Sequence, residues 1–230
     1  MKVFNHVGLI EPIEMNTVNV DGRRYYVTPT GNKHKSVTTV ISNNPKKKKV
    51  LSEWRQRVGQ EKAQRISTRS ATRGTKYHKL VENYFNNEHD PLVHKDTPLV
   101  WMMFNSSRKI LDNINNIYLQ EAALYSDYLK IAGRVDCIAE YNGKLSIIDF
   151  KTSAEEKKEA YLYDYYVQEM AYACMLQELY NIKVEQLVTI VACESGDTQV
   201  SIVPPKKEYL IKLQEYIREY EDTYERNNRG

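Results

Sequence analysis

Two short stretches decide the fold of this chain: Gly133-Arg134-Val135-Asp136-Cys137-Ile138 and Ile147-Ile148-Asp149-Phe150-Lys151-Thr152. Between them lies Tyr141-Asn142-Gly143-Lys144, and Asn-Gly between two apolar runs is the strongest short-range signal for a β-hairpin. A two-residue turn at Asn142-Gly143 pairs Tyr141 with Lys144. Counting outward from that pair places Asp136 opposite Asp149, so the stretches predict two antiparallel strands with two facing carboxylates.

The two facing carboxylates indicate a functional site. Directly opposed residues have Cβ atoms about 4.5–5.5 Å apart, and like charges there destabilise a sheet. Asp136 and Asp149 therefore need a cation, a shared proton or an exposed position. Lys151 lies two residues further on and points to the same face as Asp149. Two acids and a lysine suit a hard divalent metal beside a point charge, as in a nuclease. A structural ion pair in an apolar strand is the alternative.

The length of the chain and the lack of a break in its composition suit one large domain over residues 1–230. We expect an N-terminal hairpin and helical part (1–115), a catalytic sheet core (116–203) and a C-terminal helix (204–230).

The net charge is only +3, so binding to a polyanion needs a local basic surface. The three cysteines are far apart and form no CxxC pair, so we expect reduced thiols and no iron–sulfur cluster.

No signal, transit or membrane-spanning segment is evident, which predicts a cytoplasmic protein without membrane contact. Residues 36–42 contain five consecutive β-branched residues, 37–41, and are typical of a short strand or of an extended entry to a helix. Residues 46–49 are four lysines, which indicate a solvated loop or, alternatively, a phosphate contact.

The other expected elements are a hairpin over 18–26, helices over 51–66 and 68–84, with the second interrupted or opened at 73–75, and a helix from Pro98 through Ile114. Strands are expected over 117–125, 129–141 and 144–152, followed by a helix over 154–180. A hairpin of 187–193 and 199–203, a helix after Pro204-Pro205 and a frayed tail after Tyr224 complete the prediction.

Two polar pairs have helical spacing. Gln168 and Tyr172 lie four residues apart and share one helix face, although core packing with a satisfied amide explains them equally well. His78 and Glu82 have the same spacing and could present two polar groups to one site. A lone histidine is more often an incidental hydrogen-bonding group, and Glu121 is a weaker candidate still.

Together these motifs resemble the PD-(D/E)XK nuclease superfamily, specifically its RecB-type branch. Within that branch the chain is similar to the mitochondrial genome maintenance exonucleases and their phage and bacterial relatives, over about residues 25–172. Val135 replaces the proline that often precedes the first aspartate. The motifs that carry the resemblance are Arg73-Gly74-Thr75-x-x-His78-x-x-x-Glu82, Gly133-Arg134-Val135-Asp136, Ile148-Asp149-Phe150-Lys151-Thr152 and Gln168-x-x-x-Tyr172, with Tyr26-Val27-Thr28-Pro29-x-Gly31, Ser36-Val37-Thr38-Thr39-Val40-Ile41 and Trp54-Arg55-x-Arg57-Val58-Gly59 in addition.

The resemblance implies a mixed α/β (α+β) fold with a restriction-endonuclease-like core, in which helices flank a central mixed sheet of αβββαβ type. It also implies one or two Mg²⁺ or Mn²⁺ ions, and Lys151 as the group that orients or activates the attacking water. Gln168 and Tyr172 would position the site or the DNA backbone. The implied metal ligands are His78, Asp136, Asp149, the Phe150 backbone carbonyl and, more loosely, Glu121. The expected nucleic-acid contacts are Arg55, Arg57, Arg69, Arg73, Thr75 and Lys76.

The function that this resemblance implies is a divalent-metal-dependent DNA exonuclease that prefers single-stranded ends. It would act in replication, recombination or DNA degradation, in a bacterial or phage-infected host cytoplasm, with an unidentified partner protein. Three other functions stay open at this point: a structure-specific, junction-resolvase-like endonuclease of the same fold, a non-catalytic nucleic-acid-binding module, and a small-molecule metalloenzyme.

Overall fold

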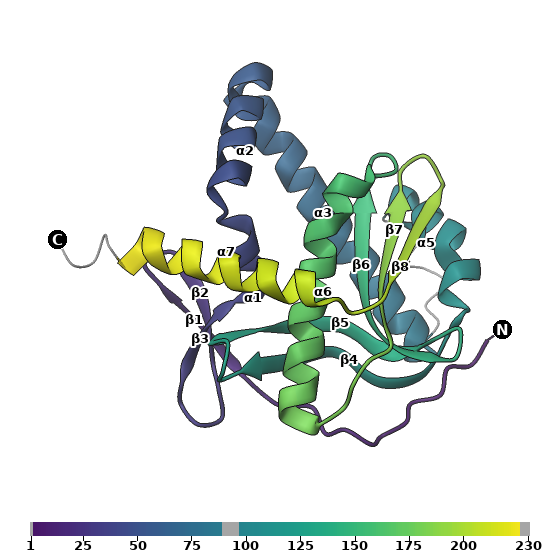
Figure 1. The fold of residues 1–230 in the computed structure, drawn as a ribbon. Coiled ribbons are helices and arrows are strands. Elements are labelled where there is room, and N and C mark those ends of the chain that lie inside the picture. The colour runs from purple at the N-terminus through teal and green to yellow at the C-terminus, as the bar shows by residue number, and fades with distance from the viewer. Residues whose placement is uncertain (1, 89–96, 226–230) are drawn as a thin grey trace.

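The computed structural model describes residues 2–88 and 97–225 (Figure 1). Helices precede and follow a group of long strands, as the sequence predicts. The elements are β1 (Asn16–Val20), β2 (Arg23–Val27), β3 (Lys33–Ser36), α1 (Val37–Ser42), α2 (Pro45–Val58), α3 (Gln60–Phe85), α5 (Pro98–Leu111), β4 (Ile114–Ser126), β5 (Ile131–Tyr141), β6 (Lys144–Ser153), α6 (Glu159–Tyr180), β7 (Gln186–Cys193), β8 (Thr198–Val203) and α7 (Lys207–Glu225).

Eight strands form one mixed sheet in the order β1-β2-β3-β5-β6-β7-β8, and β4 pairs with β5. Strand β6 is antiparallel to β5 and parallel to β7, with the helix α6 as the crossover between β6 and β7. Tyr141 pairs with Lys144 across the turn at Asn142-Gly143, where both turn residues have positive φ. The predicted hairpin and its register are confirmed, and so is the class of a central mixed sheet flanked by helices.

Strand β5 has one continuous edge and one interrupted edge. Along the first edge it pairs with β4 from Ile131 to Tyr141. Along the other edge β3 pairs with residues 131–132, and β6 pairs with residues 137–141. Residues 133–136 lack a strand partner on that edge within the described part of the chain. We call this stretch the β5 opening, and it lies between the part of β5 that pairs with β3 and the part that pairs with β6.

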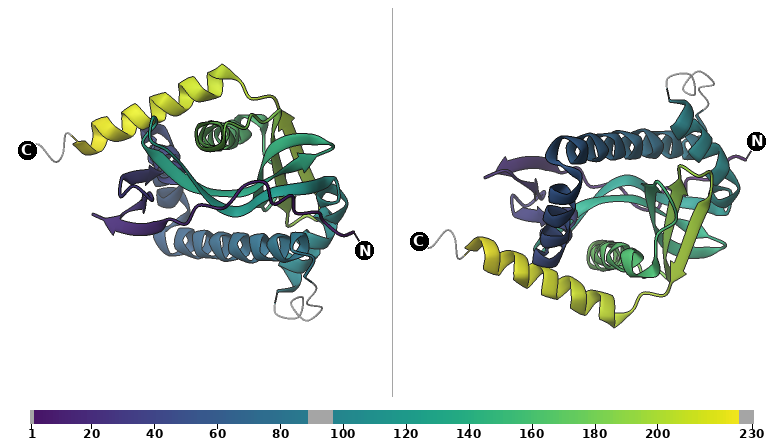
Figure 2. Two further views of the ribbon diagram at one scale, coloured as in Figure 1. Left: turned by 90° about the horizontal axis from the view of Figure 1, so that it is seen from below. Right: turned by 90° about the horizontal axis from the view of Figure 1, so that it is seen from above.

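Helices cover both faces of the sheet, and each face has its own apolar core. Figure 2 shows α6 end-on between α7 and one face of the sheet, while α3 lies along the opposite face. The first core joins α1, α6 and α7 to the sheet, and the second joins α3 and α5 to it. The largest fully buried side chains of the two cores include Leu124, Ile131, Ile138, Ile147 and Leu162 in the first and Tyr77, Phe85, Met103, Leu111 and Ile148 in the second.

Several expectations for the N-terminal part were wrong. Residues 37–42 form the helix α1 rather than a strand, because Val37, Val40 and Ile41 pack into the first core and burial outweighs their β propensity. The four lysines at 46–49 are helical rather than in a loop. Asn44 accepts hydrogen bonds from the backbone N–H groups of residues 46 and 47, and Pro45 occupies the first helical turn, so α2 begins earlier than predicted.

The break between the long helices also lies elsewhere. Gly59, with φ 86°, separates α2 from α3, whereas α3 runs through Gly74 without interruption. Glycine is tolerated there because a helical glycine costs only about 1 kcal/mol relative to alanine. Helix α6 begins at Glu159 rather than near Ala154, and Asn181 in the left-handed conformation ends it.

The other elements agree with the prediction. The hairpin around Asp21-Gly22, the helix that starts at Pro98, the hairpin of β7 and β8, and the last helix α7 are all present. The three cysteines are free thiols, as expected. The tail at residues 226–230 lies outside the described residues. In residues 2–88 and 97–225, no helix is long and apolar enough to cross a membrane.

Candidate active site

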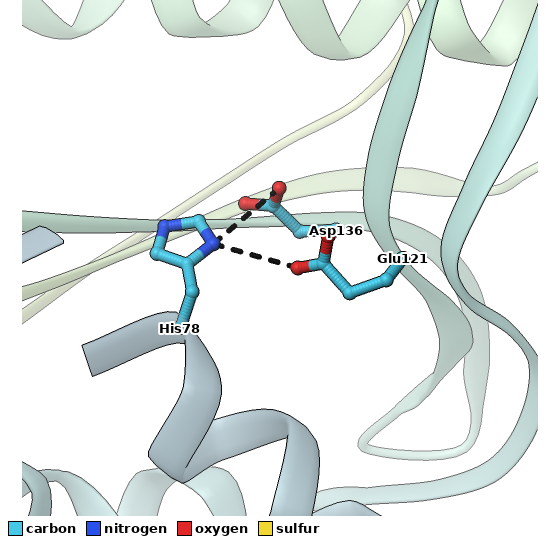
Figure 3. Close-up of side chains that lie close together, drawn as sticks. All are labelled: His78, Glu121 and Asp136. Carbon is cyan, nitrogen blue, oxygen red and sulfur yellow. Dashed lines mark ion pairs between the residues drawn. The ribbon is translucent and has the colours of Figure 1, made fainter. Parts of the chain in front are cut away.

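Three candidate ligands converge beside the β5 opening: His78 from α3, Glu121 from β4 and Asp136 from β5 (Figure 3). The Nδ1 atom of His78 lies 3.6 Å from Oε1 of Glu121 and 3.7 Å from Oδ1 of Asp136. One ligand atom from each residue lies within 4.8 Å of the other two. These three residues, far apart in the sequence, therefore form one compact group of potential metal ligands.

Irregular strand geometry places the two carboxylates of this group. The ladder between β4 and β5 runs from the pair Gln120–Cys137 to the pair Ala122–Val135, and Glu121 between them has φ 47°. A positive φ is uncommon for a residue other than glycine, asparagine or aspartate, and clusters at functional sites. Between those two pairs Glu121 lies opposite Asp136, and both carboxylates are on the His78 side of the sheet.

The orientation of the His78 ring is set from its other side. The Nε2 atom lies 2.8 Å from the backbone oxygen of Phe150, so Nε2–H donates and Nδ1 faces the carboxylates. Burial lowers the pKa of His78, but Glu121 and Asp136 outweigh burial and raise this pKa to about 9. In the metal-free protein a protonated imidazole thus offsets one of the two negative charges of these carboxylates.

The donor chemistry of the group fits a divalent cation. Two carboxylates and one imidazole suit a hard or borderline ion such as Mg²⁺ or Mn²⁺. The Phe150 carbonyl, expected as a ligand, accepts the hydrogen bond of His78 Nε2–H in this structure. The neighbouring carboxylate of Asp149 is not a member of the three-residue group.

Asp149 and Lys151 form a separate pair on β6, in which the carboxylate is buried and the lysine is half-buried. Asp149 is 2% exposed. Its Oδ1 accepts a hydrogen bond of 2.9 Å from Nε2 of Gln168, and its Oδ2 pairs with the Lys151 ammonium.

Burial raises the pKa of Asp149 to about 6, although Lys151 opposes the rise. Burial lowers the pKa of Lys151, but the carboxylates of Asp149 and Asp136 outweigh it and raise this pKa above its ordinary value. The ammonium also lies 5.1 Å from the ring centroid of Tyr165.

The two aspartates are neighbours but not a paired step of the ladder. Pairing of β5 with β6 ends at Cys137–Ile148, one residue before Asp136 and Asp149. The strands separate beyond that point, and the Phe150 N–H donates to Oδ2 of Asp136 at 2.8 Å. The register counted from the turn correctly predicted that Asp136 and Asp149 are neighbours. It did not predict that the strands separate at these two residues.

Gln168 and Tyr172, which share one face of α6, make different contacts. Gln168 reaches Asp149, whereas Tyr172 is buried with its ring against Gly133. Glu82, expected as a possible partner of His78 in one site, pairs instead with Lys79 at 3.0 Å.

The predicted nucleic-acid contacts fall into two classes. Arg73 is 9% exposed and is fixed inside the protein, since it donates to Oγ1 of Thr152 at 3.1 Å and pairs with Glu194. Arg69 also pairs with Glu194, at 3.1 Å. The hydroxyl of Thr75 donates to the backbone of its own helix. The residues of the set that are exposed without a charge partner in the described part of the chain are Arg55, Arg57 and Lys76.

Sequence reasoning missed one buried acid. Glu169 is fully buried and accepts a hydrogen bond from Thr189, which is the register partner of Asp149 on β7. Burial, followed by the charge of Asp149, raises the pKa of Glu169 well above its ordinary value. The sequence did contain a signal for this residue: an acidic side chain that follows Gln168 and precedes a mostly apolar stretch of a long helix.

A comparison with protein families gives a match over residues 34–227 to the model of the PD-(D/E)XK nuclease superfamily. The chain belongs to this superfamily. Its nucleases use divalent metal ions, which agrees with the ligand group at His78, Glu121 and Asp136. The predicted resemblance and fold are therefore confirmed at the level of the family.

Curated relatives carry a more specific name. The chain is 28% identical over 173 residues to human "Mitochondrial genome maintenance exonuclease 1", covering 70% of this chain and 49% of that protein. The mouse protein of the same name is 28% identical over 170 residues, covering 70% of this chain and 50% of that protein. The chain thus spans about half the length of these relatives. A solved structure from Eubacterium rectale has a TM-score of 0.41 and 12% identity, covering 64% of this chain and 63% of that one.

Proposed function

We propose that this chain is a divalent-metal-dependent DNA exonuclease that prefers single-stranded ends. The observation that carries the proposal is the juxtaposition of the ligand group with the Asp149–Lys151 pair beside the β5 opening. The group offers an imidazole and two carboxylates, and Lys151 adds a compact positive charge next to it. An ordinary structural ion pair does not require two further acids and a histidine at the same point of the sheet.

In this proposal His78, Glu121 and Asp136 would hold a divalent metal ion, with Asp149 as a further ligand. A bound divalent ion lowers the pKa of a coordinated water and withdraws charge from the scissile phosphate. The Lys151 ammonium orients the attacking water and stabilises negative charge as it develops on the phosphate. Gln168 holds Asp149 in place through its 2.9 Å hydrogen bond, so its role is positioning.

Binding of the substrate would combine charge with stacking. Arg55, Arg57 and Lys76 are exposed and available for phosphates, and Trp54 lies beside Arg57 in a cavity along α2. The choice of DNA and of strand ends follows the name of the curated relatives, which are exonucleases of a genome. Replication, recombination or DNA degradation and a cytoplasmic location complete the proposal.

The test uses purified protein with Mg²⁺ or Mn²⁺ and three substrates: linear single-stranded, linear duplex and circular single-stranded DNA. Loss of the linear single strand with an intact circle is the expected result. Opening of the circle would replace the proposal with an endonuclease, because a closed circle has no end. Binding without cleavage under either ion would replace it with a non-catalytic nucleic-acid-binding module.

A further inference from the structure

We propose that Arg24, Arg134 and Tyr172 form a second phosphate-binding subsite next to the candidate active site. The inference deepens the proposed function and rests on it, because the phosphate would belong to the nucleic-acid strand that is cleaved. The ligand chemistry is a nucleic-acid phosphate, either a terminal phosphomonoester or an internal phosphodiester. The candidate subsite is a polar cavity at the Gly133–Arg134 end of the β5 opening.

The cavity has a volume of about 410 Å³ and lies between the β1–β2 hairpin, the start of α1 and the β4–β5 ladder. Its lining contains two guanidinium groups and several hydroxyl groups. No carboxylate belongs to it among the described residues. The lining residues are Met15, Asn16, Thr17, Arg24, Tyr26, Ser36, Thr38, Ala123, Gly133, Arg134 and Tyr172.

One guanidinium is already held in place. An Nη atom of Arg24 donates to Oγ of Ser36 at 3.1 Å and to Oγ1 of Thr38 at 3.2 Å. These two bonds fix the group at low entropic cost and leave its other N–H donors free. A planar guanidinium with free parallel donors matches phosphate oxygens.

Neither guanidinium has a counter-charge within the described residues. The Arg24 guanidinium donates only to hydroxyls, and the side chain of Arg134 makes no ion pair or hydrogen bond with the described part of the chain. Arg73 is the contrast inside the same molecule, since Glu194 neutralises it. Two like charges that face one cavity without an acid repel each other, so an anion that enters between them is favoured.

The hydroxyl of Tyr172 supplies the third donor. Tyr172 is 2% exposed, yet its hydroxyl makes no hydrogen bond with any described residue, and it faces the cavity beside Gly133. The hydroxyl is not one of the buried polar atoms that lack a partner, so it is reachable from the cavity and can donate to an external acceptor there. A Cβ at Gly133 would lie 2.8 Å from this oxygen, so only glycine leaves room for it.

The cavity is one step away from the candidate active site. Tyr172 follows Gln168 by one turn of α6, roughly 6 Å along the helix axis. Arg134 precedes Asp136 by two residues of β5, again roughly 6–7 Å. Both displacements are comparable with the spacing of neighbouring phosphates along a strand. A strand whose scissile phosphate meets Asp136 and Lys151 therefore places an adjacent phosphate at the cavity.

The experiment measures binding without cleavage. Wild type, Arg24→Gln, Arg134→Gln and Tyr172→Phe are titrated in EDTA with a labelled single-stranded oligonucleotide at several salt concentrations. Lys144→Gln is the matched control, because Lys144 is exposed on the β5–β6 turn and its change removes one positive charge. Arg134→Gln keeps the test valid if Arg24→Gln disturbs folding, since the Arg134 side chain is exposed and makes no hydrogen bond or ion pair with the described residues.

We expect each arginine variant to raise Kd about tenfold or more and to reduce the salt slope by about one, with little change for Lys144→Gln. Oligonucleotides with 5′-phosphate, 3′-phosphate and unphosphorylated ends distinguish the two phosphate sources. A defect restricted to one phosphorylated end assigns the site to a terminal phosphomonoester, and an equal defect on all three assigns it to an internal phosphodiester. Wild-type affinity and salt slope in both arginine variants would overturn the subsite.

The failure of the subsite and that of the proposed function are separable. If wild type cleaves linear strands with Mg²⁺ or Mn²⁺ while both arginine variants bind like wild type, only the subsite is wrong. If wild type cleaves nothing, the proposed function fails, and the binding titrations in EDTA still decide whether the cavity takes a nucleic-acid phosphate.

Discussion

The backbone amide of Phe150 donates its hydrogen bond to the carboxylate of Asp136, over 2.8 Å, at the point where β5 and β6 separate. In a regular ladder a backbone carbonyl would accept that bond. Here a side chain replaces the carbonyl, so the strands can part without an unsatisfied amide. Asp136 thus has a structural task in addition to its proposed role as a metal ligand, and the two can be separated by mutation.

Asp136→Asn and Asp136→Ala should differ in stability but not in activity. The asparagine oxygen can still accept the Phe150 N–H, whereas alanine leaves a buried donor without a partner, at a cost of about 1–3 kcal/mol. Both changes remove a carboxylate from the ligand group and should abolish cleavage. Urea unfolding and a nuclease assay check this. Equal stability of the two variants would show that the amide finds another acceptor.

Lys151→Met should destabilise the protein as well as inactivate it. The substitution leaves the buried Asp149 carboxylate without its cation, and loss of one partner of a buried pair costs about 2 kcal/mol or more. Asp149→Asn combined with Lys151→Met removes both charges and should recover most of that loss without recovering cleavage. Urea unfolding in EDTA measures the recovery. A double variant as unstable as Lys151→Met would contradict the pairing.

Arg73→Ala should act on folding more than on DNA binding. Its guanidinium is buried against Thr152 and Glu194, so its removal leaves those groups without their partner and costs about 1–3 kcal/mol. Lys76→Ala is the comparison, because Lys76 is exposed on the same helix and should leave stability within about 0.5 kcal/mol of wild type. Thermal melts and binding titrations distinguish them. A weakened salt slope in Arg73→Ala at unchanged stability would restore the direct DNA contact.

Glu169→Gln should become more stabilising as pH rises. The pKa of Glu169 is raised by burial, so above its ordinary value of 4.5 the unfolded chain loses a proton that the folded protein keeps. Wild-type stability falls relative to the variant by about 1.4 kcal/mol per pH unit from there up to the folded-state pKa. Below the ordinary value both states are protonated and the difference is constant. Urea unfolding in EDTA at several pH values tests the trend, and a difference independent of pH would disprove it.

Local chemistry made much of this fold predictable. Asn142-Gly143 determines the turn and the register that brings Asp136 toward Asp149, and Pro98 and Pro204-Pro205 mark helix boundaries. The break at Gly59 was expected after residue 66, with an interruption or start of the second helix at residues 73–75, because only the backbone conformation shows that Gly59 ends a helix and Gly74 does not. The helix at 37–42 was missed because its β-branched residues are helical only when they pack into a core.

The sequence by itself determined the family motifs, the mixed sheet with its flanking helices, and the identity of the polar groups near its centre. Those features depend on local propensity, turn chemistry and spacing, which are written in consecutive residues. Only the tertiary structure decided which charges are neutralised and which remain free. It buries Arg73 against Glu194, brings Glu121 to His78, and leaves Arg24 and Arg134 facing one cavity without an acid. Electrostatic pairing depends on distances between elements far apart in the chain, and sequence spacing does not contain them.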